Sequence, residues 1–293
     1  VDGEKGSIFD GNLAQLADFD AANPAVLDYL AGAYEQWIDQ GADAFRIDTI
    51  AWMPDAFWQQ FTTRIRAKHP GFFMFGEAFD YDAAKIATHT LPGHGETSVL
   101  DFPMKQAMDE VFGHKGAGYE RLAPSLFLQG GPYANPYDLT TFYDNHDMPR
   151  MDASDEGFID AHNWLFTARG IPVIYYGSET GFMRSRAEHA GTRAYFGHPR
   201  IDAAPVFYRV LQHGDAAQTA LVLLNKGDAA QRFDVRDYLQ KGQWRDVLDG
   251  GTVAVTDTLR VDVPAHGVKV FVLDAPVAQA QLQAKLDAAM ADQ

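Results

Sequence analysis

Three acidic side chains stand in or directly after short apolar runs, where they could carry out acid–base chemistry. Asp48 lies within the run Phe45–Ile50, Glu77 lies within Phe72–Phe79, and Asp147 ends the run Leu139–Asp147. Arg46 and Asp48 are two residues apart, so they share one face of a strand. Because charges are costly inside a core, they must pair with each other, bind a ligand, or do both. Two carboxylates in unlike environments are what cleavage of a glycosidic bond requires, one as nucleophile and one as proton donor.

The elements that position these carboxylates are predicted to be strands that alternate with helices. The apolar run that holds Arg46 and Asp48 is typical of a strand buried on both faces. Further strands are predicted at Ser98–Pro103 and Ile171–Tyr176, with helices from Pro24 to Gly41, from Pro54, and at Lys105–Phe112, Tyr119–Leu128 and Phe158–Arg169. Polar residues at the carboxyl ends of strands among helices are the arrangement of a parallel α/β barrel.

Four stretches together resemble the signature regions of the α-amylase family of glycoside hydrolases and transglycosylases. They are FRID (45–48), FGEAF (75–79), YDNHD (143–147) and GIPVIYYGSE (170–179). The first is similar to the nucleophile region, the second to the acid/base region, and the third to the region of a third carboxylate. The last is similar to the final barrel strand. The resemblance implies a (β/α)8 TIM barrel.

The resemblance also implies roles for individual residues. The catalytic set is Asp48, Glu77 and Asp147, the substrate-binding set is Arg46, His146, Phe79 and Arg193, and the metal set is Asp18 with the backbone oxygen of Trp52. The metal would be calcium, which prefers hard oxygen ligands. The family's other ligands belong to a region that this sequence lacks, so we expect this chain alone to bind calcium weakly. Burial after four apolar residues should raise the pKa of Glu77, and Arg46 should keep Asp48 ionised.

Each assignment has a simpler alternative. Asp48 could be only the ion-pair partner of Arg46, Glu77 could be a strand-end residue that faces water, and the stretch DNHD (144–147) has donors that suit a metal. The favoured function is retaining hydrolysis of α-1,4-glucosidic bonds in starch or maltooligosaccharides. The first alternative is glucan transfer of the cyclodextrin glucanotransferase type. Phe79 and the segment LADFD resemble those enzymes, whereas Ala51-Trp52 replaces their lysine–histidine pair. The others are an inactive or carbohydrate-binding fragment and a purely structural piece.

The predicted domain organisation has three parts. Residues 1–203 form a partial barrel with strands four to eight, residues 204–275 form an antiparallel β-sandwich, and residues 276–293 form a helical tail. Short strands separated by Gly/Asp turns predict the sandwich. The first three barrel strands are expected to be absent, which makes the N-terminal part of the same polypeptide a candidate partner. The eighth barrel helix is expected to be reduced, because Gly181–Ala204 has no clear helical period.

The composition restricts the partners. The net charge of −16 argues against nucleic acid and anionic membranes and does not repel a neutral α-glucan. No apolar run approaches the ~18 residues of a membrane span. Cysteine is absent, which excludes a disulfide framework and is compatible with any compartment. No signal peptide is visible at Val1, and the sequence does not determine the compartment, with a secreted or periplasmic location favoured over others.

Overall fold

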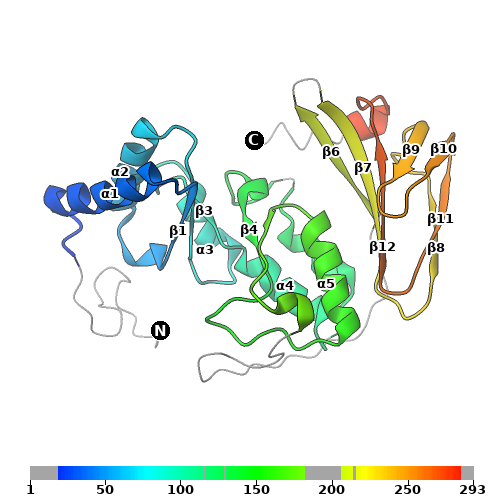
Figure 1. The fold of residues 1–293 in the computed structure, drawn as a ribbon, viewed down its shortest axis with the longest axis horizontal. Coiled ribbons are helices and arrows are strands. Elements are labelled where there is room, and N and C mark those ends of the chain that lie inside the picture. Colours follow the sequence, from blue (N-terminus) through cyan, green and yellow to red (C-terminus); the bar gives the residue numbers. More distant parts are fainter. Residues whose placement is uncertain (1–18, 115, 129, 182–205, 214–215, 285–293) are drawn as a thin grey trace. The chain divides into compact units, whose positions relative to one another are not determined.

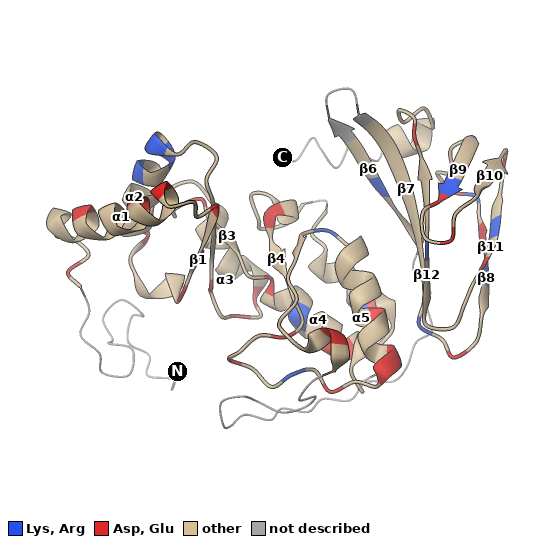
Figure 2. Cartoon of the chain, viewed as in Figure 1, with Lys and Arg blue, Asp and Glu red and all other residues tan. Residues whose placement is uncertain are grey.

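The computed structural model describes residues 19–114, 116–128, 130–181, 206–213 and 216–284 (Figure 1). The chain divides into two compact units, one of Val1–Pro103 with Gly131–Thr141 and one of Met104–Gly130 with Phe142–Gln293. Acidic positions occur throughout both units in Figure 2, as the net charge of −16 requires. Among the described residues, no helix is both long and apolar enough to cross a membrane.

The first unit alternates strands with helices. Its elements are α1 (Pro24–Asp39), β1 (Ala44–Ile47), η2 (Ile50–Trp52), α2 (Asp55–Lys68), β2 (Phe73–Gly76), α3 (Ala83–Ala87), η3 (Thr88–Thr90), β3 (Ser98–Val99), η6 (Pro136–Asp138) and β4 (Thr140–Thr141), where η denotes a 3₁₀ helix. Helix α1 begins as predicted, because Asn23 caps it by accepting the Ala25 N–H at 3.0 Å. Pro24 occupies the first turn, where its missing N–H costs nothing.

Strands β1, β2 and β3 form a parallel sheet in that order. The register pairs Ala44 with Phe73 and Ile47 with Gly76. A parallel bridge between Leu100 and Thr140 extends the arrangement to β4. Because β1 and β2 are parallel and in this register, the residues that follow them emerge side by side. The sheet therefore brings Asp48 and Glu77 to the same edge.

The prediction that the first strand is buried on both faces is wrong. Phe45 and Ile47 are buried, whereas Ala44 and Arg46 are exposed. The buried face is covered by α1, since the ring of Phe45 lies 5.1 Å from that of Tyr34. In the described part of the chain, the other face is open to solvent and carries the charged residues.

The second unit contains helices followed by an all-β region. Its elements are α4 (Phe102–Phe112), η4 (Tyr119–Arg121), η5 (Ala123–Ser125), α5 (Asp155–Thr167), β5 (Ile171–Pro172), η7 (Ser178–Thr180), β6 (Val206–His213), β7 (Ala216–Asn225), β8 (Gln231–Val235), β9 (Gly242–Asp246), β10 (Thr252–Val255), β11 (Leu259–Val263) and β12 (Gly267–Leu273). The helix predicted at 119–128 is instead the two short elements η4 and η5. Pro124 in the first turn of η5 explains the break, since proline cannot continue a helix from the preceding turn.

The β region consists of antiparallel strands. One sheet has the order β10-β9-β12-β7-β6 and a second pairs β11 with β8. Side chains from both sheets share one buried cluster, with Leu221, Leu223, Phe233, Val235, Trp244, Leu259, Val263, Phe271 and Leu273 among its members. The strands after residue 205 are therefore antiparallel, as predicted. Helical backbone occurs at 280–284, within the predicted tail. The predicted domain boundary at residue 203 lies outside the described residues.

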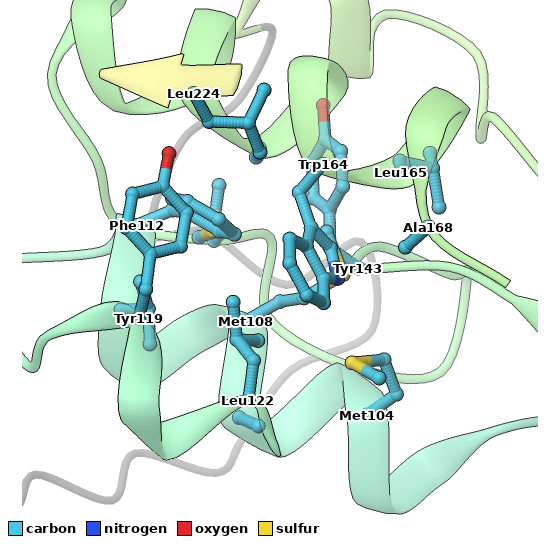
Figure 3. Packing of buried hydrophobic residues seen from close by; sticks show 14 of the residues in the cluster. Met104, Met108, Phe112, Tyr119, Leu122, Tyr143, Trp164, Leu165, Ala168 and Leu224 are labelled. Atoms are coloured by element: carbon cyan, nitrogen blue, oxygen red, sulfur yellow. The ribbon is translucent and has the colours of Figure 1, made fainter. Parts of the chain in front are cut away.

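A second apolar cluster joins the helices of this unit to strand β7. Its members come from α4, η4, α5 and β7 and from the segments next to them, and Figure 3 shows Leu224 beside Trp164 and Tyr119. Leu224 is fully buried and Trp164 is nearly so. Because an apolar side chain contributes about 1.5–3 kcal/mol when fully buried, this contact is a major stabilising interface within the unit.

His266 adds a polar contact to the same interface. Its Nδ1 lies 2.9 Å from Oδ2 of Asp160 on α5, and its Nε2 lies 3.0 Å from Oδ1 of Asp228. Burial disfavours the charged imidazole, but the hydrogen bonds to both carboxylates outweigh it and raise the pKa of His266. Burial also raises the pKa of Asp160, against the opposing effect of His266. The unit thus contains a partly buried ion pair that depends on protonation.

Candidate active site

Arg46, Asp48 and Glu77 form a single charged cluster at the carboxyl ends of β1 and β2. Nη1 of Arg46 lies 2.6 Å from Oδ1 of Asp48, and Nη2 of the same guanidinium lies 3.2 Å from Oε2 of Glu77. One cation therefore binds both carboxyl groups, which holds them close in spite of their mutual repulsion. The predicted pairing of Arg46 with Asp48 is confirmed.

The two carboxyl groups have unlike environments. The side chain of Asp48 is 66% exposed, whereas that of Glu77 is 12% exposed. Burial raises the pKa of Glu77, the Thr49 N–H and the charge of Arg46 oppose that rise, and Asp48 adds to it. The predicted direction of the Glu77 pKa is confirmed. Two carboxyl groups in environments this different are suited to different roles, the buried one as acid and the exposed one as nucleophile.

Backbone hydrogen bonds fix the two strand ends against each other. The Glu77 N–H donates to the Ile47 carbonyl at 2.8 Å, and the Ile50 N–H donates to the Glu77 carbonyl at 3.1 Å. Between them, the Thr49 N–H donates to Oε2 of Glu77 at 3.3 Å. These hydrogen bonds hold the residues after β1 against the residue after β2, and so fix the backbone from which the side chains of Asp48 and Glu77 extend.

His146 and Asp147 belong to the second unit and contact each other. Nε2 of His146 lies 3.1 Å from Oδ2 of Asp147, and both side chains are about half exposed. The Asp147 N–H donates to Oδ1 of Asn145 at 3.1 Å, which turns the chain locally. The convergence of Asp147 with Asp48 and Glu77 stays a prediction.

A buried network of polar groups involves residues that precede and follow His146 and Asp147 in the sequence. Asp144 accepts hydrogen bonds from the Met151 N–H at 2.7 Å and from Oγ of Ser178 at 2.8 Å. Nη1 of Arg150 lies 3.9 Å from the same carboxylate, and its guanidinium stacks 4.4 Å from the centre of the Tyr175 ring. The network connects both ends of the segment 144–151 to the core, so it fixes the loop that carries His146 and Asp147. From the sequence, Asp144 was considered only within the stretch 144–147 as a candidate metal ligand, and the roles of Arg150 and Ser178 were not predicted.

Of the remaining predicted site residues, the structure describes Phe79 and Trp52 but not Arg193 or Asp18. Phe79 is 63% exposed and packs edge-on against Phe102, with ring centres 4.9 Å apart, so its ring is available to a ligand. Arg193 and Asp18 lie outside the described residues. Trp52 ends the 3₁₀ helix η2, and its N–H donates to the Thr49 carbonyl at 2.9 Å.

The residues that the structure describes include no cluster of three or more His, Cys, Asp or Glu side chains placed to hold a metal ion. Of the two predicted calcium ligands, the Trp52 carbonyl belongs to a described residue, whereas Asp18 lies outside the described ranges. Calcium binding stays a prediction, and no chemical step is assigned to it.

Comparison with known proteins agrees with this geometry. The family model described as the α-amylase catalytic domain matches residues 8–195, a span that contains β1 to β5 and all three predicted catalytic carboxylates. A match over more than half of the chain is decisive, and the protein belongs to the α-amylase family. The prediction drawn from the four signature stretches is confirmed.

Relatives of two kinds share this similarity. The α-amylase of Streptomyces lividans is 33% identical over 215 residues, which are 66% of this chain and 23% of that protein. The cyclomaltodextrin glucanotransferase of Bacillus sp. (strain 38-2) is 35% identical over 205 residues, which are 69% of this chain and 28% of that protein. This chain thus spans about a quarter of the length of these curated relatives.

The solved structures include a similar fold. The structure of CldA, described as a cyclomaltodextrin glucanotransferase with a three-domain ABC distribution, matches with a TM-score of 0.71 and 27% identity. The match covers 92% of this chain and 64% of that one. The α/β and antiparallel parts described above therefore have counterparts in a protein of the TIM-barrel family to which the α-amylases belong.

Proposed function

We propose that this chain carries the catalytic pair of a retaining glycoside hydrolase that cleaves α-1,4-glucosidic bonds in starch or maltooligosaccharides. The observation that carries the proposal is the single guanidinium of Arg46, which binds an exposed Asp48 and a buried Glu77. Retaining enzymes need two carboxyl groups only about 5 Å apart, and a shared cation favours that spacing. The proposed barrel part supplies strands four to eight as β1 to β5, and a C-terminal β-sandwich follows it.

The proposed reaction has two steps. In the first, a carboxylate oxygen of Asp48 bonds to the anomeric carbon while the bond to the leaving oxygen breaks, and Glu77 gives that oxygen its proton. In the second, the oxygen of a water molecule bonds to the same carbon and Glu77 takes a proton from that water. The bond between the carbon and Asp48 breaks, which releases the carboxylate. Burial of Glu77 suits the first step because it raises the pKa of this carboxyl and so favours its protonated form.

Other residues are proposed to bind the sugar. Asp147 and His146 bind hydroxyl groups of the reacting ring, and the exposed face of Phe79 packs on the neighbouring sugar. Arg193 is proposed to bind further along the substrate. Calcium, when bound, would supply structural support near Asp18 and the Trp52 carbonyl rather than chemistry.

Glucan transfer is the second candidate, and the similarity to cyclomaltodextrin glucanotransferases supports it. The two reactions share the covalent intermediate and differ only in whether water or a sugar hydroxyl accepts the glycosyl group. Ala51 and Trp52 carry no charge that could bind an acceptor, which supports hydrolysis. Product analysis on maltoheptaose separates the two, because hydrolysis yields only shorter reducing sugars and transfer yields cyclic or longer products.

The acid role is tested with Glu77→Gln on two substrates. On maltoheptaose, the variant should lose at least about a hundredfold in rate, the usual contribution of general acid catalysis. On an α-maltosyl fluoride, whose leaving group needs no proton, the first step should be nearly unchanged. Glu120→Gln, at an exposed position, serves as the matched control.

Equal losses of the Glu77 variant on both substrates would remove Glu77 from the acid role. No turnover of either substrate by the unmodified chain, combined with retained binding of maltoheptaose, would favour the carbohydrate-binding alternative.

A further inference from the structure

The turn after Asp48 has an unusual backbone conformation. Thr49 has φ 48° and ψ 44°, the left-handed region that L residues rarely adopt and that costs a β-branched residue most. In this conformation its N–H points at Oε2 of Glu77, 3.3 Å away. A conformation of this cost persists only when its surroundings hold it. The question is which groups do so.

Ile50, the next residue, is fixed from three directions. Its N–H donates to the Glu77 carbonyl at 3.1 Å, and its side chain is fully buried against Gly76. Its carbonyl accepts the Met53 N–H within the turn at 3.5 Å and, more closely, Nε1 of Trp58 at 2.7 Å. The first two contacts join the turn to β2, whereas the Trp58 contact joins it to helix α2. Among the described side chains, Trp58 is therefore the one that donates a hydrogen bond to this carbonyl.

Trp58 is itself held rigidly. It is 8% exposed, and its ring meets those of Phe57 and Phe61 edge-on, with centres 5.2 Å and 5.8 Å apart. Gly95 leaves room on another side, since a Cβ there would lie 3.0 Å from Cβ of Trp58. A donor fixed by packing loses little entropy when it forms its hydrogen bond, and a buried bond of this kind is costly to break.

We propose that Trp58 is a positioning residue for the Asp48–Glu77 pair. Its indole N–H fixes the Ile50 carbonyl, which keeps Thr49 in the left-handed conformation that directs the Thr49 N–H at Glu77. As a statement about catalysis this inference rests on the proposed function, but as a statement about geometry it does not. Trp58 touches no reacting atom and acts through Ile50 and Thr49.

The inference has an electrostatic consequence at Glu77. Three groups face this carboxyl: the Arg46 guanidinium, the Asp48 carboxylate and the Thr49 N–H. The first and third favour the ionised form, and the second disfavours it. When Trp58 no longer holds the turn, the Thr49 donor moves away and the ionised form of Glu77 loses a stabilising contact. The pKa of Glu77 should therefore rise further.

The test replaces the indole N–H and follows the Thr49 amide by NMR hydrogen exchange. Trp58→Phe removes the donor but also part of the ring, so a second variant carries 3-benzothienylalanine at position 58, in which sulfur replaces the N–H. Trp37→Phe, at a 63% exposed tryptophan of α1, is the matched control. We expect the Thr49 amide to exchange about tenfold faster in both Trp58 variants, the effect of one lost buried hydrogen bond. Exchange at Ile65 of α2 should be unchanged.

The second readout is the titration of the Glu77 carboxyl followed by ¹³C NMR, which should move to higher pH in the Trp58 variants only. Neither readout needs turnover, so failure of the proposed function leaves the outcome interpretable. An unchanged Thr49 exchange rate in the benzothienyl variant would overturn the inference. Faster exchange at Thr49 and Ile65 by the same factor would also overturn it, because that result indicates general destabilisation of the unit.

Discussion

Gly76, the last residue of β2, lies against the side chain of Ile50, which follows the end of β1 by three residues. A Cβ added there would lie 2.6 Å from Cδ1, 2.8 Å from Cγ2 and 3.0 Å from Cβ of Ile50. The backbone φ of Gly76 is not positive, so conformational freedom does not explain the glycine. Close contact with Ile50 does explain it. We therefore predict that Gly76→Ala is destabilising for steric reasons alone.

The magnitude follows from how little Ile50 can move. Its N–H and carbonyl are both hydrogen-bonded, at 3.1 Å and 2.7 Å, so the side chain cannot retreat without breaking one of these bonds. Overpacking a well-packed site costs about 1–3 kcal/mol, and a fixed neighbour places this site at the upper end. We expect Gly76→Ala to lower the free energy of unfolding of the first unit by about 2–3 kcal/mol.

A double-mutant cycle separates the steric contact from other effects. Ile50→Ala alone should cost about 2–5 kcal/mol through the cavity it leaves. In the double variant, the methyl group that Gly76→Ala introduces partly fills that cavity. The combined cost should therefore be about 1–2 kcal/mol less than the sum of the two costs measured separately.

Native-state hydrogen exchange at the Glu77 amide, which bonds to the Ile47 carbonyl at 2.8 Å, reports the first unit specifically. The matched control is Gly32→Ala, where nothing lies within 4 Å of an added Cβ, and which should be neutral or slightly stabilising. Purely additive costs, or a Gly76→Ala variant as stable as the unmodified protein, would refute the steric argument.

Two further predictions concern the second unit. Because the folded-state pKa of His266 is raised, its contribution to stability is complete below the ordinary histidine value of about 6.5 and is lost as pH rises through the folded value. The pKa of Asp160 is also raised, so its deprotonation favours unfolding in the same direction. Urea unfolding monitored in this unit should show that the free energy of unfolding falls as pH rises. His266→Gln should reduce this fall by about 1–2 kcal/mol, whereas His114→Gln at an exposed site should leave it unchanged. Asp144→Asn should lower the free energy of unfolding by about 2–3 kcal/mol, because a buried carboxylate that accepts two hydrogen bonds beside a buried guanidinium becomes neutral. Asp147→Asn, at a half-exposed site, should cost less than about 0.5 kcal/mol, and an equal cost at both positions would contradict the argument.

The sequence was sufficient for features that depend on local periodicity. Parallel strands at β1, β2 and β3 and the cap of α1 were predictable because apolar runs and Asn-Pro have short-range physical causes. Strand β10 was not predictable from the sequence, since Thr252–Val255 is short and its residues alternate poorly between faces, with only Val255 buried. The predicted two-sided burial of β1 failed because apolar composition reports how much of a strand is buried and not which face is covered.

The site shows the same division between local and long-range causes. Asp48 and Glu77 could be recognised because each follows its strand directly, and the parallel register then makes them neighbours. The contact of Ile50 with Gly76 and the hydrogen bond from Trp58 could not be recognised, because each joins residues whose proximity exists only after folding. In the sequence, Trp58 is one more aromatic residue on an amphipathic helix, and its indole N–H gives no sign of a specific acceptor.

The chemistry of the pair therefore depends on residues that carry no reactive group. Arg46 contacts both carboxyl groups because the ends of β1 and β2 lie side by side, and directly after Asp48 the chain turns at Thr49 in a strained conformation. The contacts of Ile50 offset that strain. Its N–H bonds to the Glu77 carbonyl, and its carbonyl accepts the Met53 N–H within the turn and the indole N–H of Trp58 from helix α2. It follows that substitutions in the segment 49–58 should alter the acid–base balance of Glu77 more than substitutions of equal size on the exposed face of α1, although both leave every carboxylate in place.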